Sequence, residues 1–315
     1  MVYLCAVYDD NGKDRRMTKE TAPMKTPNRR FEISLLLLLA LFWGSSYLFL
    51  KVAVAEIPPL TLIAARVGGA ALFLLIVLRF RKERLPNEGR TWRMLGVQSF
   101  LNSIGAWTLL AWGQQHVDAG LASVLNSTSP IFVFLFTVLV TRHEAIGAAK
   151  VTGAVIGICG VTLIVGIDAL QGLGASVAGQ LACLLSAALY AGAAIYGRHF
   201  GHLGACATAA GTMLWGVAVL VPLALVFDRP WTLSPSLAAI AATAMLSIFC
   251  TGVALMLYFR LVRTLGSLGV ASQAYMRAGF GVVLGMMFLG ETMSFTVAAG
   301  LAAAILGVAL INWRS

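Results

Sequence analysis

Long apolar runs separated by short polar segments dominate the chain from residue 33 onward. A run of about 20 apolar residues is long enough to cross a bilayer as a helix. The pattern predicts ten such runs, and therefore an all-α integral membrane protein with ten transmembrane helices. The predicted spans are 33–55, 60–80, 92–114, 119–141, 146–167, 174–197, 205–227, 234–259, 267–289 and 295–313.

The second half of the chain repeats the first at an offset of 147 residues. Seven positions between residues 144 and 164 recur identically at this offset, which also aligns Trp43 with Tyr190. We therefore predict a first five-helix repeat over 31–168 and a second over 174–315. Because five is odd, the second repeat enters the membrane in the opposite orientation. Inverted repeats are typical of secondary transporters, whose substrate site lies near the midplane between the repeats.

The composition supports this interpretation, since 59% of the 315 residues are hydrophobic and only 11% are charged. An ordinary soluble domain has about 25% charged residues. The net charge of +10 follows the expected topology and does not indicate nucleic-acid binding, because the outer loops hold only Lys51 and Arg229. Both termini are therefore predicted to be cytoplasmic. Residues 1–30 are expected to form a disordered basic cytoplasmic tail.

Four motifs occur in a specific order along this duplicated chain. They are ALFWGSSYLFLKVA (40–53), PPLTLIAARVGGAALFLL (58–75), AGLASVLNSTSPIFVFLFTVLVTRHE (119–144) and SLGVASQAYMRAGFGVVLGMMFLGE (267–291). Together they resemble the ten-helix exporters of the drug/metabolite transporter superfamily, which have two EamA-type repeats, and most of all the amino-acid exporters, including the aromatic branch.

This resemblance implies an inner-membrane secondary transporter. It would export amino acids, aromatic ones included, or similar small metabolites, by alternating access through a central cavity between the repeats. Efflux of drug-like compounds, and a membrane receptor or scaffold without transport, are the alternatives. The expected partners are a small-molecule substrate and the lipid bilayer; the oligomeric state is open, and a monomer is compatible with the sequence.

Arg277 is a charged residue in the middle of the ninth predicted span. At ~1.5 Å per residue it lies ~15 Å deep, too far for easy snorkelling. Gly269, Gln273, Arg277, Gly281 and Gly285 form one stripe of polar and small residues at a spacing of four. A charge at this depth costs ~2.5 to 3.5 kcal/mol, so the stripe should face a water-filled cavity or another helix. A guanidinium can hold a carboxylate bidentately; bonding to helix carbonyls or to Asn126 is the structural alternative.

Further polar and aromatic residues are candidates for the same site. Pro130 removes a backbone donor, which predicts a kink with exposed acceptors beside Asn126 and Ser127. Gln98 and Asn102 are four residues apart and should share a helix face. Hydrogen bonding between helices would explain these two residues as well as a role in the site does. The full candidate set is Arg277, Gln273, Tyr275, Asn126, Ser127, Pro130, Trp43, Tyr47, Asn102, Trp107, Tyr190 and Tyr258.

The remaining polar residues predict structure and topology. Arg66 lies about six residues into the second span, so its side chain is expected to snorkel to the outer surface. All 13 carboxylates fall in the tail, in loops or at span ends, so none is predicted at the midplane. The histidines also lie at loops or span ends, and no nucleophile motif of the GxSxG kind occurs. We therefore predict no enzymatic activity, no cofactor and no metal site.

Overall fold

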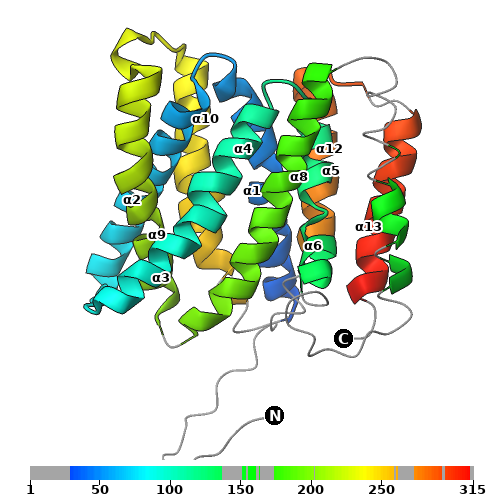
Figure 1. Cartoon of the computed structure of the whole chain (residues 1–315). Helices are drawn as coiled ribbons and strands as arrows, with labels where there is room; N and C mark the ends of the chain where they lie inside the picture. Colours follow the sequence, from blue (N-terminus) through cyan, green and yellow to red (C-terminus); the bar gives the residue numbers. More distant parts are fainter. Residues whose placement is uncertain are drawn as a thin grey trace, which may run out of the picture.

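The computed structural model describes residues 29–136, 151–153, 155–160, 163, 174–201, 203–258, 260–261, 273–292 and 295–312. Every regular element within these ranges is a helix (Figure 1). Six segments are long and apolar enough to cross a membrane: Arg30–Val54, Pro59–Arg81, Ala119–Phe136, Ser176–Phe200, Ala205–Asp228 and Leu237–Tyr258. The predicted all-helical, multi-span class is confirmed, and the count of ten spans stays a prediction.

Besides a short helical segment over residues 151–153 and 155–160, the described part of the first half contains four helical passes. They are α1 (Arg29–Val54), α2 (Pro59–Arg81), α3 (Gly89–Ser99) with α4 (Gly105–Gly113), and α5 (Ala119–Asn126) with α6 (Ser129–Phe136). A π-helical turn, η1 (Phe100–Ile104), joins α3 directly to α4. Pro59 begins α2 at a position where its missing N–H costs nothing, and Lys82 ends it in the left-handed conformation. The predicted span 146–167 lies mostly outside the described residues.

The second half repeats this order. Its helices are α8 (Gly174–Tyr196), α9 (Ala205–Leu223), α10 (Leu237–Ser247), α12 (Gln273–Leu289) and α13 (Phe295–Asn312). Shorter helical turns extend or join them: η3 (Gly197–Phe200), η4 (Ala224–Asp228), η5 (Pro230–Thr232) and the π-helical η6 (Ile248–Val253). The first residues of the predicted span 267–289, up to residue 272, lie outside the described residues.

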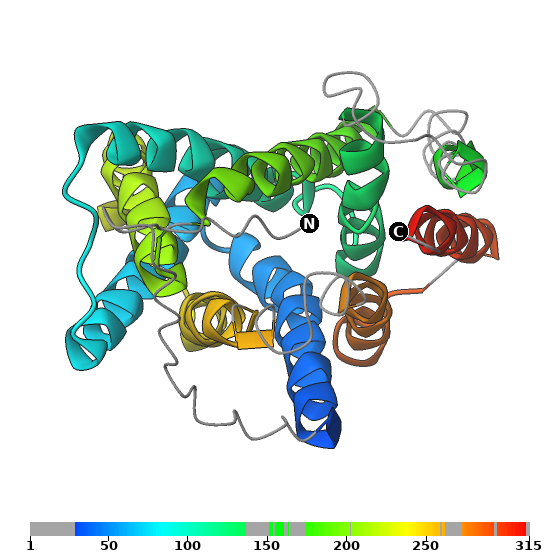
Figure 2. The same cartoon turned by 90° about the horizontal axis from the view of Figure 1, so that it is seen from below.

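The helices of the two halves interleave. In the first half α1 packs against α10 and α12, and Figure 2 shows it between them. Its counterpart in the sequence repeat, α8, packs against α4, α5 and α6, while α2 packs against α9. The first helix of each half thus contacts the third and fourth helices of the other half. The packing is the same when the halves are exchanged.

A close approach of α1 to α12 sets the position of Arg277. A Cβ atom on Gly44 would lie 2.6 Å from the Cβ of Phe280 and 3.0 Å from the carbonyl oxygen of Arg277. Only glycine leaves room for this contact. Because Gly44 lies beyond the middle of the 26-residue helix α1, Arg277 is held deep within the bundle.

Candidate substrate site

The Arg277 guanidinium is poorly satisfied by the protein. Its Nη2 reaches the Ser127 hydroxyl only at 3.5 Å, and its Nε is buried without an acceptor among the described residues. Asn126 and the described helix carbonyls accept nothing from it, so the structural alternative finds no support in these contacts. Gln273, one turn earlier, is also buried, and its Oε1 has no donor. These unmet groups are suited to a polar ligand.

The stripe of small residues on α12 faces other helices, as predicted. Gly281 packs against Ser123 of α5, and Gly285 packs against Gly120. Large apolar side chains on the opposite face of α12, such as Val283 and Met286, are exposed. Arg277 therefore lies on the inner face of its helix. The side chain of Tyr275, a candidate on the same helix, lies outside the described residues.

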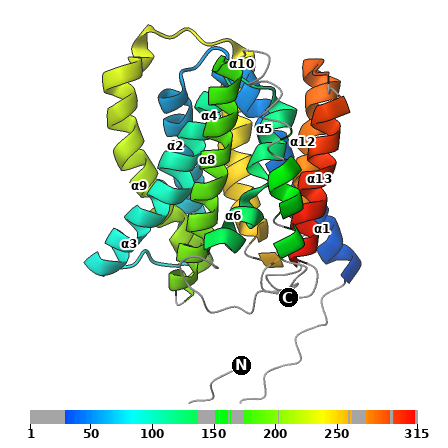
Figure 3. The same ribbon diagram turned by 45° about the vertical axis from the view of Figure 1, so that its right-hand side comes forward.

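The predicted kink at Pro130 occurs as a break between α5, which packs against α12, and α6, which continues below α5 (Figure 3). The carbonyl oxygens at the break are not exposed, however, which corrects the sequence prediction. The Ser129 hydroxyl donates to the Asn126 carbonyl at 2.7 Å, and the Thr128 hydroxyl to the Leu125 carbonyl at 2.6 Å. These two hydroxyl groups thus satisfy carbonyl oxygens at the break. Pro130 therefore interrupts the helix here without leaving either carbonyl free to bind a ligand.

Three buried side chains link α1, α5 and α8 beside Arg277. The Tyr47 hydroxyl donates to Asn126 Oδ1 at 3.0 Å, and Asn126 Nδ2 donates to the Ser186 hydroxyl at 3.1 Å. Asn126 is therefore used to position Tyr47. Ser186 could not be predicted from the sequence, because a serine in an apolar span carries no signal of its own.

Two aromatic pairs connect the halves. The Trp107 Nε1 donates to the Tyr190 hydroxyl, and the Trp43 and Tyr258 rings lie 5.5 Å apart between centroids. Trp43 and Tyr190 occupy equivalent positions in the repeat. Each contacts an aromatic residue of the third pass of the other half, so four of the predicted candidates form two related pairs.

Asn102 is not brought to this group by any described contact. Its amide donates to the neighbouring Ser103 hydroxyl at 3.3 Å, and the Oε1 of Gln98 is buried without a donor. The π-helical turn η1 starts at Phe100, between the two residues. It changes the helical register, so a spacing of four no longer guarantees a shared face.

Arg66 corrects a second prediction, since it does not snorkel. Its side chain is buried, with 5% of the residue exposed. The guanidinium carbon lies 3.9 Å from the centre of the Trp107 ring, and Nε donates to the Thr251 hydroxyl at 3.0 Å. The helix α2 turns the Arg66 side chain toward α4 and η6. Arg66 is therefore a further candidate that was not predicted from the sequence.

The two arginines contact neighbouring parts of the same cluster. Arg66 lies over Trp107, which donates to Tyr190, and Arg277 contacts Ser127, next to the Asn126 that accepts from Tyr47. Neither arginine forms an ion pair with a described residue. The described carboxylates lie at helix ends and in loops; Glu32, for example, pairs with Arg260 at 2.9 Å. This part of the bundle thus carries positive charge without a counter-ion among the described residues.

Three carboxylates in the segments that follow α1, α9 and α12 bind helix N-termini of the other half; the ends of these three helices lie at the top of Figure 1. Glu56 accepts from the Ser236 amide and hydroxyl at 2.6 and 2.7 Å. Asp228 accepts from the Thr61 amide at 2.7 Å. Glu291 accepts from the Ala119 and Gly120 amides at 2.6 and 2.9 Å. We call these contacts the upper clamp.

The clamp is electrostatically favourable because a helix N-terminus carries partial positive charge. The amide and hydroxyl of Ser236 hold the pKa of the exposed Glu56 carboxyl below its ordinary value. Lys51 adds a contact at the same end, donating to the carbonyls of Gln114 and Val117 at 2.9 and 2.7 Å. The charged groups of the clamp are therefore matched by protein partners.

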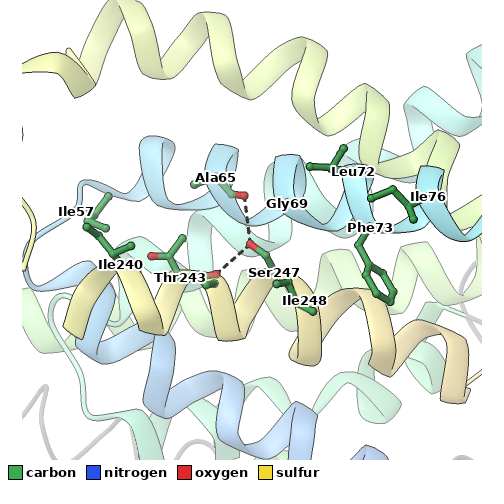
Figure 4. Close-up of a pocket in the computed structure, with 11 residues that line it drawn as sticks. Ile57, Ala65, Gly69, Leu72, Phe73, Ile76, Ile240, Thr243, Ser247 and Ile248 are labelled. Atoms are coloured by element: carbon green, nitrogen blue, oxygen red, sulfur yellow. Dashed lines mark hydrogen bonds between the residues drawn. The ribbon is translucent and has the colours of Figure 1, made fainter. Parts of the chain in front are cut away.

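A groove of about 530 Å³ lies between α2 and α10 (Figure 4). Leu72 and Ile240, which line it, are exposed at the outside of the bundle. Its hydroxyl groups are already used, since Ser247 donates to the carbonyls of Ala65 and Thr243. This groove therefore presents an apolar wall to the membrane and has no free donor for an acidic ligand.

These observations define a class of protein. A multi-span helical bundle with two interleaved halves and unpaired buried donors between them fits a membrane transporter of small molecules. The model of the EamA-like transporter family matches residues 30–166 and again residues 177–313. The chain belongs to this family and contains two EamA repeats. The second match begins 147 residues after the first, at residue 177 against residue 30, in agreement with the offset in the sequence.

Two relatives and one solved structure extend this result. The uncharacterized inner membrane transporter YedA of Escherichia coli is 26% identical over 276 residues, 87% of this chain and 88% of its own. The protein named "Probable terminal-alkyne amino-acid exporter" of Streptantibioticus cattleyicolor is 26% identical over 287 residues. The match covers 89% of this chain and 93% of that protein. A crystal structure with a TM-score of 0.64 and 18% identity covers 91% of this chain and all of its own, which shows a shared fold.

Proposed function

We propose that this protein is a secondary transporter of the inner membrane that exports amino acids, aromatic ones included, or similar small metabolites. The observation that carries the proposal is Arg277, whose buried Nε has no acceptor among the described residues. A carboxylate is the ligand that a guanidinium binds best, in bidentate geometry. The exporter of terminal-alkyne amino acids among the relatives supports the same substrate class.

The surroundings of Arg277 suggest the roles of the other candidates. In this proposal Arg277 binds the substrate carboxylate, while Gln273 and Ser127 supply further polar contacts. The Trp107–Tyr190 and Trp43–Tyr258 pairs provide aromatic surface for the rest of the substrate. Tyr47, held by Asn126, lies beside them. Binding in this proposal is followed by relative rocking of the two repeats.

The transport cycle requires ten spans in two inverted units, over 31–168 and 174–315, with the basic tail 1–30 and both termini in the cytoplasm. The upper clamp would then close the outer end in the state described, so that the substrate enters from the cytoplasm. Cysteines placed at residues 87 and 201, in a background without native cysteines, should resist an impermeant reagent added outside. Rapid labelling from outside would refute the topology.

The role of Arg277 is tested in liposomes by comparing the half-saturation concentrations for free amino acids with those for their amides or esters. Removing a charge-assisted bond costs ~1.5 to 3 kcal/mol, roughly ten- to hundredfold in affinity. Arg277→Gln should raise the half-saturation concentration for free amino acids by this factor and spare their amides or esters. Arg277→Lys keeps the charge but loses the planar fork, so it should fall between the two.

A structural arginine would give a different result. Its loss would lower yield and thermal stability, and would affect free amino acids and their amides alike. Equal loss for both would remove the support for the proposed substrate class. Binding without flux in the wild-type protein would support a receptor instead, and preferred transport of drug-like cations would support multidrug efflux.

A further inference from the structure

The starting point is the set of hydrogen-bond donors that Arg66 leaves unused. A guanidinium has five N–H donors, and Arg66 uses only Nε, which donates to the Thr251 hydroxyl. Trp107 covers one face of the guanidinium plane. The two terminal nitrogens have no acceptor among the described residues. Among the described residues, a cation with 5% of its residue exposed is therefore bound through Nε and by the Trp107 ring.

These contacts do not compensate for the burial of the charge. A buried ion loses its hydration, which one hydroxyl contact and one ring contact restore only in part. A protein carboxylate would be the usual remedy, but no described carboxylate contacts Arg66. The neighbouring tyrosines, Tyr47 and Tyr190, are neutral donors or acceptors and carry no counter-charge. The site is suited to an anion that the protein itself does not supply.

Arg66 is also placed to share a ligand with Arg277. Arg66 belongs to the first EamA repeat and Arg277 to the second. Arg277 contacts Ser127, whose neighbour Asn126 accepts from Tyr47, and Tyr47 packs in one cluster with Trp107 and Tyr190. Tyr190 is bonded to Trp107, the residue on which Arg66 stacks. Two cations, one from each repeat, thus flank a common set of side chains.

We propose that Arg66 binds a second acidic group of the transported molecule, so that the site prefers substrates with two anionic groups. Among amino acids these are glutamate and aspartate, and the same chemistry would accept other small dicarboxylates. The inference rests on the proposed transport function, in which Arg277 binds the first carboxylate. It adds a second contact point, which fixes the orientation of the substrate between the repeats.

The test compares substrates that differ by one charge and have nearly the same shape. Labelled glutamate and glutamine, aspartate and asparagine, and succinate and its monoamide are offered to liposomes containing the full-length protein. We expect the wild type to prefer the dianionic member of each pair. Arg66→Gln should lower glutamate transport roughly ten- to hundredfold more than glutamine transport, so that the preference is largely lost. Arg79→Gln, an exposed arginine on the same helix, is the matched control and should keep the wild-type ratio.

Arg66→Gln could disturb folding, so the wild-type protein provides a second measurement. Glutamate should raise its melting temperature more than glutamine at equal concentration. The inference is overturned if the wild type shows no preference in either assay, or if Arg66→Gln lowers glutamate and glutamine transport equally. Its failure is distinguishable from that of the proposed function, because the effect of Arg277→Gln on free acids against amides is measured separately. Arg66-dependent succinate transport without amino-acid transport would uphold the second subsite and refute the amino-acid assignment.

Discussion

The upper clamp and the centre of the bundle treat charge in opposite ways. Each clamp carboxylate accepts from one or two amides at a helix N-terminus in the other half, at 2.6 to 2.9 Å. At the centre, Arg66 and Arg277 have one hydrogen bond each to a hydroxyl, at 3.0 and 3.5 Å. The clamp carboxylates have partners in the protein and connect the two halves at one end. The two arginines lie between the halves without an anionic partner among the described residues.

This difference separates structural charges from functional ones. A paired carboxylate at a helix end stabilises the arrangement of the chain by itself. An unpaired cation between helices destabilises the protein. An anion that binds from outside removes this destabilisation, and its affinity is higher for that reason. The comparison predicts that pairing the centre should harm transport, whereas loosening the clamp should change only how the bundle opens.

The largest effect is expected from pairing the centre. Ser127→Asp would place a carboxylate next to Arg277, whose Nη2 already reaches the Ser127 hydroxyl. The internal carboxylate would compete with the substrate, and affinity should fall by roughly a hundredfold, the upper end for a lost charge-assisted bond. The measurement is the half-saturation concentration for amino-acid transport in liposomes.

The matched control for this change is Ser127→Asn, which has the same shape without the charge. It should retain most of the transport activity. Equal inhibition by both variants would show that the size of the side chain at this position, and not its charge, decides binding. It would contradict the claim that the unpaired charge of Arg277 is needed for transport.

A smaller effect is expected at the clamp. Glu291→Gln weakens two bonds to the N-terminus of α5, with a loss of about 1 to 2 kcal/mol for a partly buried charge of this kind. Opening of the clamp should become roughly 5 to 30 times more frequent, and transport should persist. Hydrogen exchange of the Ala119 and Gly120 amides measures the opening directly.

The control for this change is Glu88→Gln, which lies outside the clamp and should leave the exchange of these amides unchanged. Loss of transport in a folded Glu291→Gln protein would contradict the structural role and would indicate that Glu291 couples transport to an ion or proton.

The smallest effect concerns pH. Because Ser236 lowers the pKa of Glu56 below its ordinary 4.5, this contact contributes fully above pH 4.5 and is lost as the pH falls below it. The protection of the Ser236 amide, relative to Glu56→Gln, should be constant between pH 5 and 8 and disappear in acid. A change in that window would assign proton sensing to Glu56.

The helical class and the repeat could be predicted from the sequence because both depend on local composition and spacing. Apolar runs predicted the passes, and the offset of 147 residues in the sequence matches the two family segments. The π-helical turns η1 and η6 could not be predicted, since no residue type specifies them. That is why Asn102 was placed with Gln98 on a face that η1 interrupts.

The sequence could propose a candidate site residue where its depth in an apolar run is the signal. Arg277 lies in the middle of such a run and was selected on that ground; its role stays a prediction. For Arg66, depth suggested a path to the surface, and the outcome depended on which way α2 faces. Trp107 and Thr251, which hold its side chain, are distant in sequence. Side-chain direction follows from helix packing, which a single sequence does not encode in local patterns.

The most direct test of the central claim is a structure of the protein with a labelled dicarboxylate substrate bound. We predict one carboxylate within 2.7 to 2.9 Å of Arg277 nitrogens, the distance typical of charge-assisted bonds, and the second acidic group on the terminal nitrogens of Arg66. A substrate bound elsewhere, with both guanidinium groups still without an anionic partner, would contradict the account.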